Sequence, residues 1–128
     1  MIKKILIVDD STSSRFFLKA SLPKEVEYEI FEAENGLIAL EKFKEFRPDV
    51  VFMDLTMPVM DGLQSLEEIL KVDRNATVVI VTADIQKKTV QRAMDLGAFT
   101  LIAKPIKKDK IENVVSIINK IKNPENAV

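Results

Sequence analysis

The chain has 128 residues, of which 47% are hydrophobic and 30% charged, and this length suits one domain. It contains no Cys and no His, which excludes disulfides, thiolate catalysis, imidazole bases and most zinc sites. The net charge of -1, from 19 basic and 20 acidic residues, gives no general attraction to nucleic acid. Any chemistry must therefore use carboxylates, amines and hydroxyls.

Short apolar runs alternate with helical patterns along the chain. The first run, residues 5–8, contains only Ile, Leu and Val, which predicts a strand buried on both faces. Four further runs predict strands at residues 28–33, 50–53, 78–81 and 99–103. The run at 28–33 partly alternates between apolar and polar residues, which is typical of a strand at the edge of a sheet.

Between these runs, apolar residues recur at helical spacing. A face of Phe16, Phe17 and Ala20 predicts the first helix, with Ser11 or Thr12 as its cap. The later faces are Ala39, Leu40 and Phe43; Leu63, Leu66 and Leu70; Val90, Ala93 and Met94; and Ile111, Val114, Val115 and Ile118. The alternation of strands and helices predicts a parallel sheet covered by helices on both faces. We expect one domain over residues 1–122 and a short tail over 123–128.

Charge and hydropathy also bound the location of the protein. No run of 18 apolar residues exists, and the N-terminus lacks the pattern of a signal peptide, so we expect a cytoplasmic protein without membrane insertion. Lysines are frequent between residues 104 and 122, where only Asp109 and Glu112 oppose them. This basic end is typical of a solvated last helix, and a partner or membrane surface is the alternative. A monomer is the default expectation.

Polar residues follow several of the predicted strands, at the point where each strand ends. Asp9 and Asp10 follow the first strand, Asp54 the third, Thr82 the fourth and Lys104 the fifth. In an open parallel sheet, ligands bind beyond the carboxyl ends of the strands, where the strand order reverses. In the order 2-1-3-4-5 the aspartates would therefore converge on one cleft, with Thr82 and Lys104 at its side.

This combination of groups indicates phosphoryl transfer. Three carboxylates beside one lysine favour a divalent cation, and Mg²⁺ prefers such hard oxygen ligands. With a hydroxyl and an ammonium nearby, the set suits phosphoryl chemistry, and a carboxylate is left as the nucleophile. Each residue alone is also typical of a helix cap, a turn or a strand exit, so the interpretation depends on their joint placement.

The sequence resembles the receiver domain of two-component response regulators, in particular the stand-alone, chemotaxis-type kind. The resemblance runs from about Lys3 to Ile121. It is carried by the segments ILIVDD (5–10), ENG (34–36), DVVFMD (49–54), MPVMDG (57–62), VTA (81–83), GA (97–98) and KP (104–105). It implies a flavodoxin-like (βα)5 fold with a central five-stranded parallel sheet in the order 2-1-3-4-5.

The resemblance implies a role for each matching residue of the acidic site. Asp54 would accept the phosphoryl group from the phosphohistidine of a sensor histidine kinase. Asp10 would bind Mg²⁺ directly and Asp9 mostly through water. Asp54 and the backbone carbonyl of Thr56 would complete the ligands from the protein.

The resemblance also implies a switch beside the acidic site. Thr82 would supply a hydroxyl that turns to bond a phosphoryl oxygen, and Lys104 would pair with the phosphoryl group. Pro105 matches a cis-proline of the family. In the family, Thr56 and Asp84 lie at positions that tune the lifetime of the phosphoryl group, and an acidic Asp84 could position the attacking water.

The output surface in this family comprises the fourth helix, fifth strand and fifth helix, and the matching exposed positions include Lys87, Val90 and Leu101. Leu101 departs from the family, which commonly has Tyr or Phe there, and this puts the aromatic half of the switch in doubt. Phe99 is expected on the same strand face as Leu101 and could compensate.

Several alternatives remain open at this point. The output partner could be a downstream target such as a flagellar switch component, or a phosphotransfer protein in a relay, and a phosphatase is a further candidate partner. A receiver-like docking module that needs no phosphate is another alternative. A flavodoxin-like cofactor binder would use the loop Ser11–Ser14, but Asp9 and Asp10 would repel an FMN phosphate. An aspartate-nucleophile phosphatase would carry Asp-x-Asp-x-Thr after the first strand, where this chain has Asp9, Asp10 and Ser11.

Overall fold

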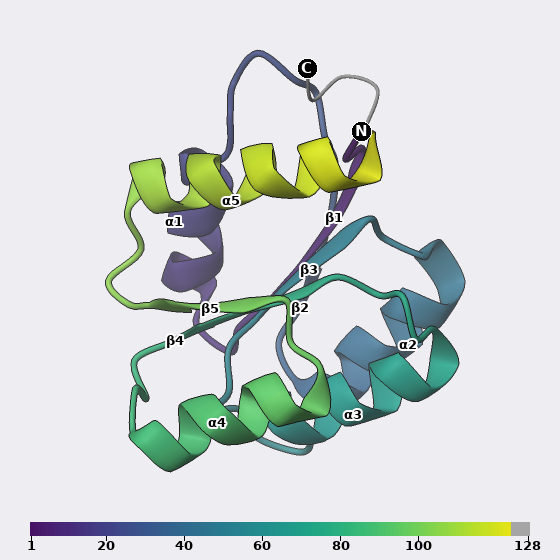
Figure 1. Ribbon diagram of the computed structural model, residues 1–128, viewed down its shortest axis with the longest axis vertical. Coiled ribbons are helices and arrows are strands. Elements are labelled where there is room, and N and C mark those ends of the chain that lie inside the picture. The colour runs from purple at the N-terminus through teal and green to yellow at the C-terminus, as the bar shows by residue number, and fades with distance from the viewer. Residues whose placement is uncertain (124–128) are drawn as a thin grey trace.

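The computed structural model describes residues 1–123, and over this range five strands alternate with five helices (Figure 1). The strands are β1 (Lys4–Val8), β2 (Glu29–Ala33), β3 (Val50–Met53), β4 (Val78–Thr82) and β5 (Thr100–Ala103). The helices are α1 (Thr12–Ser21), α2 (Gly36–Phe46), α3 (Gly62–Val72), α4 (Lys87–Leu96) and α5 (Lys108–Lys122). Each predicted strand is present, within one residue of its expected bounds. The tail predicted at 123–128 lies outside the described residues, apart from Asn123.

The five strands form one parallel sheet in the predicted order β2-β1-β3-β4-β5. Its register places Val8 level with Ala33 on one side and with Met53 on the other. The chain passes from β1 to β2 on one side and later to β3 on the other, so the strand order reverses at β1 and β3. This is the flavodoxin-like α/β arrangement, and it opens a binding crevice beyond the carboxyl ends of β1 and β3.

Helices cover both faces of the sheet. Because side chains alternate along a strand, Leu6 and Val8 of β1 join the core under α2, α3 and α4, whereas Ile5 and Ile7 join the core under α1 and α5. Figure 1 shows the same division, with α1 and α5 together on one side of the sheet. Burial on both faces explains why β1 reads as an unbroken apolar run. Within the described residues, no helix has the length and apolar character needed to cross a membrane.

The predicted inner face of α1 is wrong. The helix buries Leu18 and Ser21, whereas Phe16 and Phe17 are 61% and 59% exposed and Ala20 is also exposed. The predicted cap is correct, because the Ser11 side chain accepts the backbone N–H of Ser14. A helix turns about 100° per residue, so the stripe that contains Leu18 and Ser21 leaves the neighbouring phenyl rings outside. The two rings instead contact each other edge to face, with centroids 5.9 Å apart.

Candidate functional site

Three carboxylates gather beyond the ends of β1 and β3. Asp9 follows β1, Asp10 comes next, and Asp54 follows β3; one carboxylate oxygen of each lies within 4.8 Å of the others. Asp9 and Asp54 are only 5% and 8% exposed, whereas Asp10 is open to solvent. The fold thus brings together the three aspartates that the sequence places at neighbouring strand ends.

Backbone hydrogen bonds hold these strand ends together. The N–H of Asp54 donates to the carbonyl of Val8 at 2.9 Å, and the N–H of Asp9 donates to the carbonyl of Ala33 at 3.0 Å. The parallel ladder therefore continues one residue beyond each strand. Because Asp9 and Asp54 belong to this extension, the register of the sheet sets the spacing of their carboxylates.

Lys104 enters the cluster from the end of β5. Its Nζ atom donates to Oδ2 of Asp9 at 2.8 Å and to Oδ2 of Asp54 at 3.1 Å. Its backbone N–H donates to the carbonyl of Thr82 at 2.9 Å, and the following peptide bond, to Pro105, is cis. The lysine predicted at the side of the cleft therefore contacts two of the three carboxylates directly.

The ammonium of Lys104 is stabilised in its charged form. Burial lowers the pKa of Lys104, but the hydrogen bonds to Asp9 and Asp54 and the charges of both carboxylates together outweigh burial. The net result is a pKa above the usual value for lysine. At neutral pH the cluster therefore contains one fixed positive charge.

The remaining donor set fits a hard divalent cation. Three carboxylates and one ammonium leave an excess of negative charge. The second oxygens of Asp9 and Asp54 accept the backbone N–H groups of Ser11 and Leu55, at 2.9 and 2.7 Å. Among residues 1–123, no hydrogen bond reaches the carboxylate of Asp10. Mg²⁺ binds through a few carboxylates and several waters. This cluster supplies the carboxylates, and its partly exposed position admits the waters.

The loop that follows Asp54 is fixed by close backbone contacts. A Cβ atom on Gly62 would lie 2.1 Å from the carbonyl oxygen of Asp54, so only glycine fits there. The N–H of Gly36 donates to the carbonyl of Met60 at 2.8 Å, and the Ser65 hydroxyl donates to the carbonyl of Gly36 at 2.8 Å. These bonds join the starts of α2 and α3. Thr56, the predicted carbonyl ligand, lies exposed within this loop.

Known proteins resemble this chain over nearly all of its length. A family model described as the response regulator receiver domain matches residues 5–116. The chain belongs to the receiver domain family of response regulators. A receiver domain is a signal-transduction module, and the acidic cluster described above lies inside the matched region.

Named relatives and one solved structure give the extent of the similarity. The chemotaxis protein CheY of Thermotoga maritima is 42% identical over 120 residues, which cover 93% of this chain and 97% of that protein. The sporulation initiation phosphotransferase F of Bacillus subtilis is 41% identical over 115 residues, covering 90% and 92%. A chain of the CheX–CheY–BeF3–Mg²⁺ complex from Borrelia burgdorferi matches with a TM-score of 0.84 at 34% identity, covering 90% and 88%.

In this receiver domain, Thr82 is connected to the start of α4. The threonine is 1% exposed, and its hydroxyl oxygen accepts the backbone N–H of Asp84 at 3.2 Å. The carboxylate of Asp84 in turn accepts the N–H of Gln86 at 3.1 Å and the hydroxyl of Thr89 at 3.3 Å. The side chain of Gln86 makes no cap hydrogen bond, and the Asp84 carboxylate instead links the residue before α4 to Thr89 in its first turn. The resemblance to receiver domains had assigned Asp84 only an effect on the lifetime of the phosphoryl group.

The predicted output positions of the receiver lie on α4 and β5. Lys87 begins α4 and is exposed, whereas Val90 and Leu101 are half-buried. Leu101 packs against the core under α2, α3 and α4, but Phe99 packs against the core under α1 and α5. The expectation that Phe99 shares the face of Leu101 is therefore wrong. β5 begins at Thr100, so the alternation of a strand does not extend back to Phe99.

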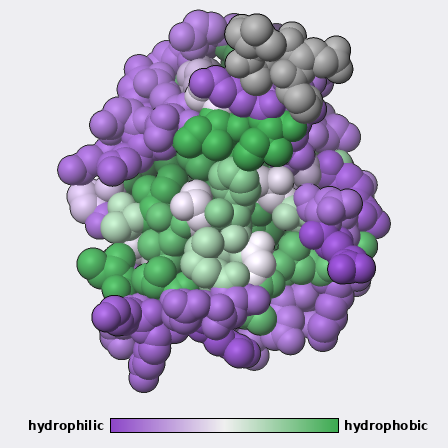
Figure 2. All heavy atoms as spheres, in the orientation of Figure 1, coloured by the Kyte–Doolittle hydropathy of each residue, from purple (hydrophilic) through white to green (hydrophobic). Residues whose placement is uncertain are grey.

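Apolar surface lies beside these positions. Figure 2 shows it across β5, between α5 and the polar outer face of α4. Ile117 and Ile121 of α5 are 41% and 60% exposed. A cavity of about 410 Å³ opens beside β5, where Leu101 forms part of the wall and Lys107 and Lys110 add positive charge. The surface therefore offers an apolar strip with a basic end.

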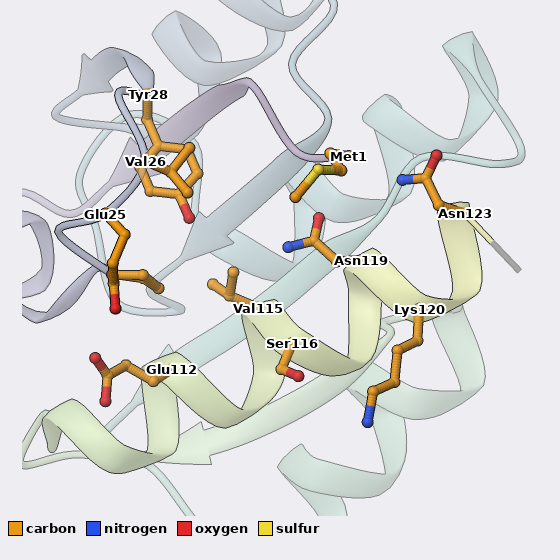
Figure 3. Close-up of a pocket in the computed structure, with 11 residues that line it drawn as sticks. Met1, Glu25, Val26, Tyr28, Glu112, Val115, Ser116, Asn119, Lys120 and Asn123 are labelled. Carbon is orange, nitrogen blue, oxygen red and sulfur yellow. The ribbon is translucent and has the colours of Figure 1, made fainter. Parts of the chain in front are cut away.

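A separate cavity lies at the opposite end of the sheet. It measures about 470 Å³ and separates the segment before β2 from α5 (Figure 3). Met1, Tyr28 and Asn119 line it, and none of the predicted site residues does. Burial, with a smaller contribution from Glu25, raises the pKa of Tyr28 above its usual value. The acidic cluster, at the carboxyl ends of β1 and β3, is thus separate from this cavity.

Proposed function

We propose that this chain is a cytoplasmic, phosphorylation-dependent signalling switch in which Asp54 accepts a phosphoryl group from a partner histidine kinase. The observation that carries the proposal is the environment of the Asp54 carboxylate. It is 8% exposed, grouped with Asp9 and Asp10, and its Oδ2 atom lies 3.1 Å from Nζ of Lys104. A carboxylate held among oxygen ligands and a cation suits attack on phosphorus.

The aspartates and one backbone carbonyl form the proposed Mg²⁺ site. Asp10 and Asp54 would bind the ion directly, Asp9 mostly through water, and the carbonyl of Thr56 would add a further ligand. When bound, Mg²⁺ would neutralise negative charge on the phosphoryl oxygens. The relative from Borrelia burgdorferi, whose complex contains BeF3 and Mg²⁺, supports this assignment.

The transfer itself uses three side chains of this chain. An oxygen of Asp54 forms a bond to phosphorus as the bond between phosphorus and the histidine nitrogen breaks, and the imidazole leaves with that electron pair. The ammonium of Lys104 pairs with the incoming phosphoryl oxygens. The hydroxyl of Thr82 turns to donate to one of these oxygens and gives up the N–H of Asp84. This exchange would bias α4 toward a second arrangement.

The surface beside α1 is the proposed docking site for the donor protein. Phe17 lines a cavity of about 360 Å³ together with Lys104, Pro105 and Ile106. Phe16 lies next to it, and both phenyl rings are largely exposed. Exposed aromatic rings are common at the centres of protein interfaces. These rings would supply the apolar contact for the kinase.

The proposed output is regulated binding of a target protein at α4, β5 and α5, with Lys87, Val90 and Leu101 in the contact surface. The similarity to chemotaxis proteins favours a chemotaxis-type role with a flagellar switch component as target. The similarity to the sporulation phosphotransferase supports a second candidate, a relay that passes the phosphoryl group to another protein. Transfer from phosphorylated Asp54 to a histidine phosphotransfer protein would favour the relay.

The intact mass of the protein tests the proposed acceptor. After incubation with Mg²⁺ and a small acyl phosphate, the parent should gain one phosphoryl group and Asp54→Asn should gain none. Asp95→Asn, an exposed aspartate of α4, is the matched control and should behave as the parent. Equal gain by Asp54→Asn would refute the acceptor. If the folded parent gains nothing and also fails to bind beryllofluoride, a phosphate-independent docking module becomes the better interpretation.

A further inference from the structure

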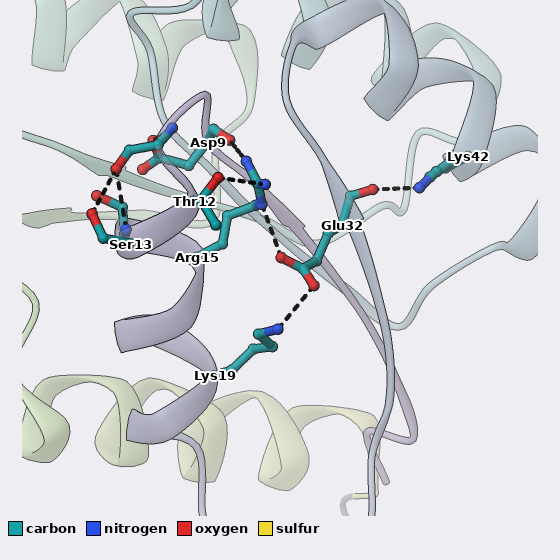
Figure 4. Close-up of polar contacts among 9 residues, drawn as sticks. Asp9, Thr12, Ser13, Arg15, Lys19, Glu32 and Lys42 are labelled. Atoms are coloured by element: carbon teal, nitrogen blue, oxygen red, sulfur yellow. Dashed lines mark hydrogen bonds and ion pairs between the residues drawn. The ribbon is translucent and has the colours of Figure 1, made fainter.

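A network of charged side chains links the backbone of Asp9 to Glu32 of β2 (Figure 4). Arg15 of α1 donates Nη1 to the backbone carbonyl of Asp9 at 2.5 Å and Nε to the carboxylate of Glu32 at 2.8 Å. The second oxygen of Glu32 accepts Nζ of Lys19 at 2.9 Å, and its backbone carbonyl accepts Nζ of Lys42. The Arg15 side chain is only 14% exposed. Its guanidinium is therefore held between β2 and the first acidic residue of the site.

The carbonyl that Arg15 contacts belongs to the peptide group between Asp9 and Asp10. The plane of this peptide sets the direction in which the Asp10 side chain leaves the backbone. The carboxylates of Asp9 and Asp54 have direct hydrogen bonds of their own, from Ser11, Leu55 and Lys104. Over residues 1–123 the carboxylate of Asp10 has none. Its position therefore depends on its backbone, which the Asp9 carboxylate holds from the N–H of Ser11 and Arg15 holds from the carbonyl of Asp9.

We infer that Arg15 is a positioning residue, which holds Asp10 in place for the divalent cation through the peptide group between Asp9 and Asp10. The inference rests on the proposed function, because it takes the aspartates as a Mg²⁺ site. Arg15 is not among the residues that the sequence predicts for the site. Glu32 would serve as the anchor that orients the guanidinium.

The direction of the change in Mg²⁺ affinity distinguishes a positioning role of Arg15 from a purely electrostatic one. A guanidinium close to a cation site repels the cation, so Arg15 acting by charge alone would weaken Mg²⁺ binding, and its removal would tighten it. A positioning residue has the opposite sign, and its removal weakens binding. Lysine keeps the charge but lacks the planar fork that contacts Asp9 and Glu32 together. The variant Arg15→Lys therefore tests geometry at constant charge.

The experiment is a Mg²⁺ titration of the full chain, followed by the amide NMR shifts of Asp10 and Ser11. Loss of a residue that orients a metal ligand costs about tenfold or more in metal affinity, and we expect about that increase in Kd for Arg15→Ala. Arg15→Lys should lie between Arg15→Ala and the parent. The matched control is Lys19→Ala, which removes a charge paired with the same Glu32 but does not contact Asp9. Its Kd should stay within about twofold of the parent.

The outcomes separate this inference from the proposed function. If the parent binds Mg²⁺ and Arg15→Ala binds it equally well or more tightly, the positioning role is refuted and the proposed function stands. If the parent fails to bind Mg²⁺, both are refuted. Thermal unfolding without Mg²⁺ checks that each variant folds. Should Arg15→Ala not fold, Arg15→Lys decides, since weaker binding supports the role and unchanged binding refutes it.

Discussion

Nζ of Lys104 lies 3.1 Å from Oδ2 of Asp54, although 50 positions separate the two residues in the chain. The same ammonium lies 2.8 Å from Oδ2 of Asp9. Lys104 thus bonds the carboxylates of Asp9 and Asp54 but not that of Asp10. This ammonium therefore links the ends of β1, β3 and β5 at the cluster of aspartates.

Removal of the Lys104 charge should destabilise the fold. In Lys104→Met the carboxylates of Asp9 and Asp54 lose their common partner, which costs about 1–3 kcal/mol of unfolding free energy. Mg²⁺ should then raise the Tm of the variant by more than it raises the Tm of the parent, because the ion meets a more negative site. Thermal unfolding with and without Mg²⁺ measures both effects. Lys107→Met, an exposed lysine three residues away, should leave both quantities unchanged, and an equal Mg²⁺ response in both variants would contradict the argument.

Glu32 should contribute to the acid sensitivity of the fold. The hydrogen bond from Lys19 lowers the pKa of Glu32 and, with the contacts of Arg15 and the charge of Lys19, outweighs the opposing effect of burial. Its stabilising effect is therefore present above the pKa of the unfolded chain, about 4.3, and is lost as the pH falls through the lower folded pKa. The carboxylate is 37% exposed, so solvent screening keeps the effect below about 1 kcal/mol.

Urea unfolding between neutral and acid pH checks this prediction. The unfolding free energy of Glu32→Gln should fall less steeply below about pH 4.5 than that of the parent. Glu29→Gln serves as control, because Glu29 is an exposed residue of the same strand. Parallel curves for the parent and Glu32→Gln would show that the pair with Lys19 and Arg15 does not stabilise the fold.

Loss of the Asp84 side chain should loosen the first turn of α4. Asp84→Ala removes the acceptor for the N–H of Gln86 and the hydroxyl of Thr89, and loss of hydrogen bonds of this kind costs about 1 kcal/mol. Hydrogen exchange at the amides of Lys87 and Thr89 should become faster, while exchange in α2 stays the same. Asp95→Ala, near the other end of α4, is the control. Unchanged exchange at the first turn would show that the Asp84 carboxylate does not hold the start of α4.

Val59 should be replaceable with a gain in stability. It has φ of 69°, a left-handed conformation that β-branched residues rarely adopt, and it is 77% exposed, so burial does not compensate the strain. Asn tolerates this conformation, and Val59→Asn should raise the unfolding free energy by about 1 kcal/mol. Val59→Ile keeps the branching and should be neutral. Urea unfolding distinguishes the two, and a loss of stability in Val59→Asn would point to a packing role.

The sequence was most informative at the points where an apolar run ends and an aspartate follows. The apolar run before Asp9 and the run before Asp54 mark strands buried on both faces, and the change to carboxylate marks their ends. Parallel pairing then brings both ends to one edge without any further information. For this reason the strands and the polar residues at their ends could be predicted from the pattern, whereas the order of the strands came from the resemblance to receiver domains.

The contacts between elements were harder to predict. Phe16 and Phe17 are more apolar than Ser21, but the way α1 packs between β1 and α5 turns Ser21 inward and the phenyl rings outward. Phe99 and Leu101 are two residues apart, yet the turn before β5 places them in different cores. The contact of Arg15 with Glu32 joins a helix to a strand 17 residues away. Such pairs depend on the relative position of two elements, which neither segment encodes by itself.

The contacts that hold the surroundings of Asp54 differ between its two sides. On that side, Gly62 packs against the backbone of Asp54, and Gly36, Met60 and Ser65 tie the starts of α2 and α3 to each other. On the side of Thr82, the carboxylate of Asp84 bonds the N–H of Gln86 and the hydroxyl of Thr89 at the start of α4. The backbone around Asp54 is therefore held by more contacts toward α2 than toward α4. A modification of one Asp54 oxygen should therefore displace α4 and leave α2 almost in place.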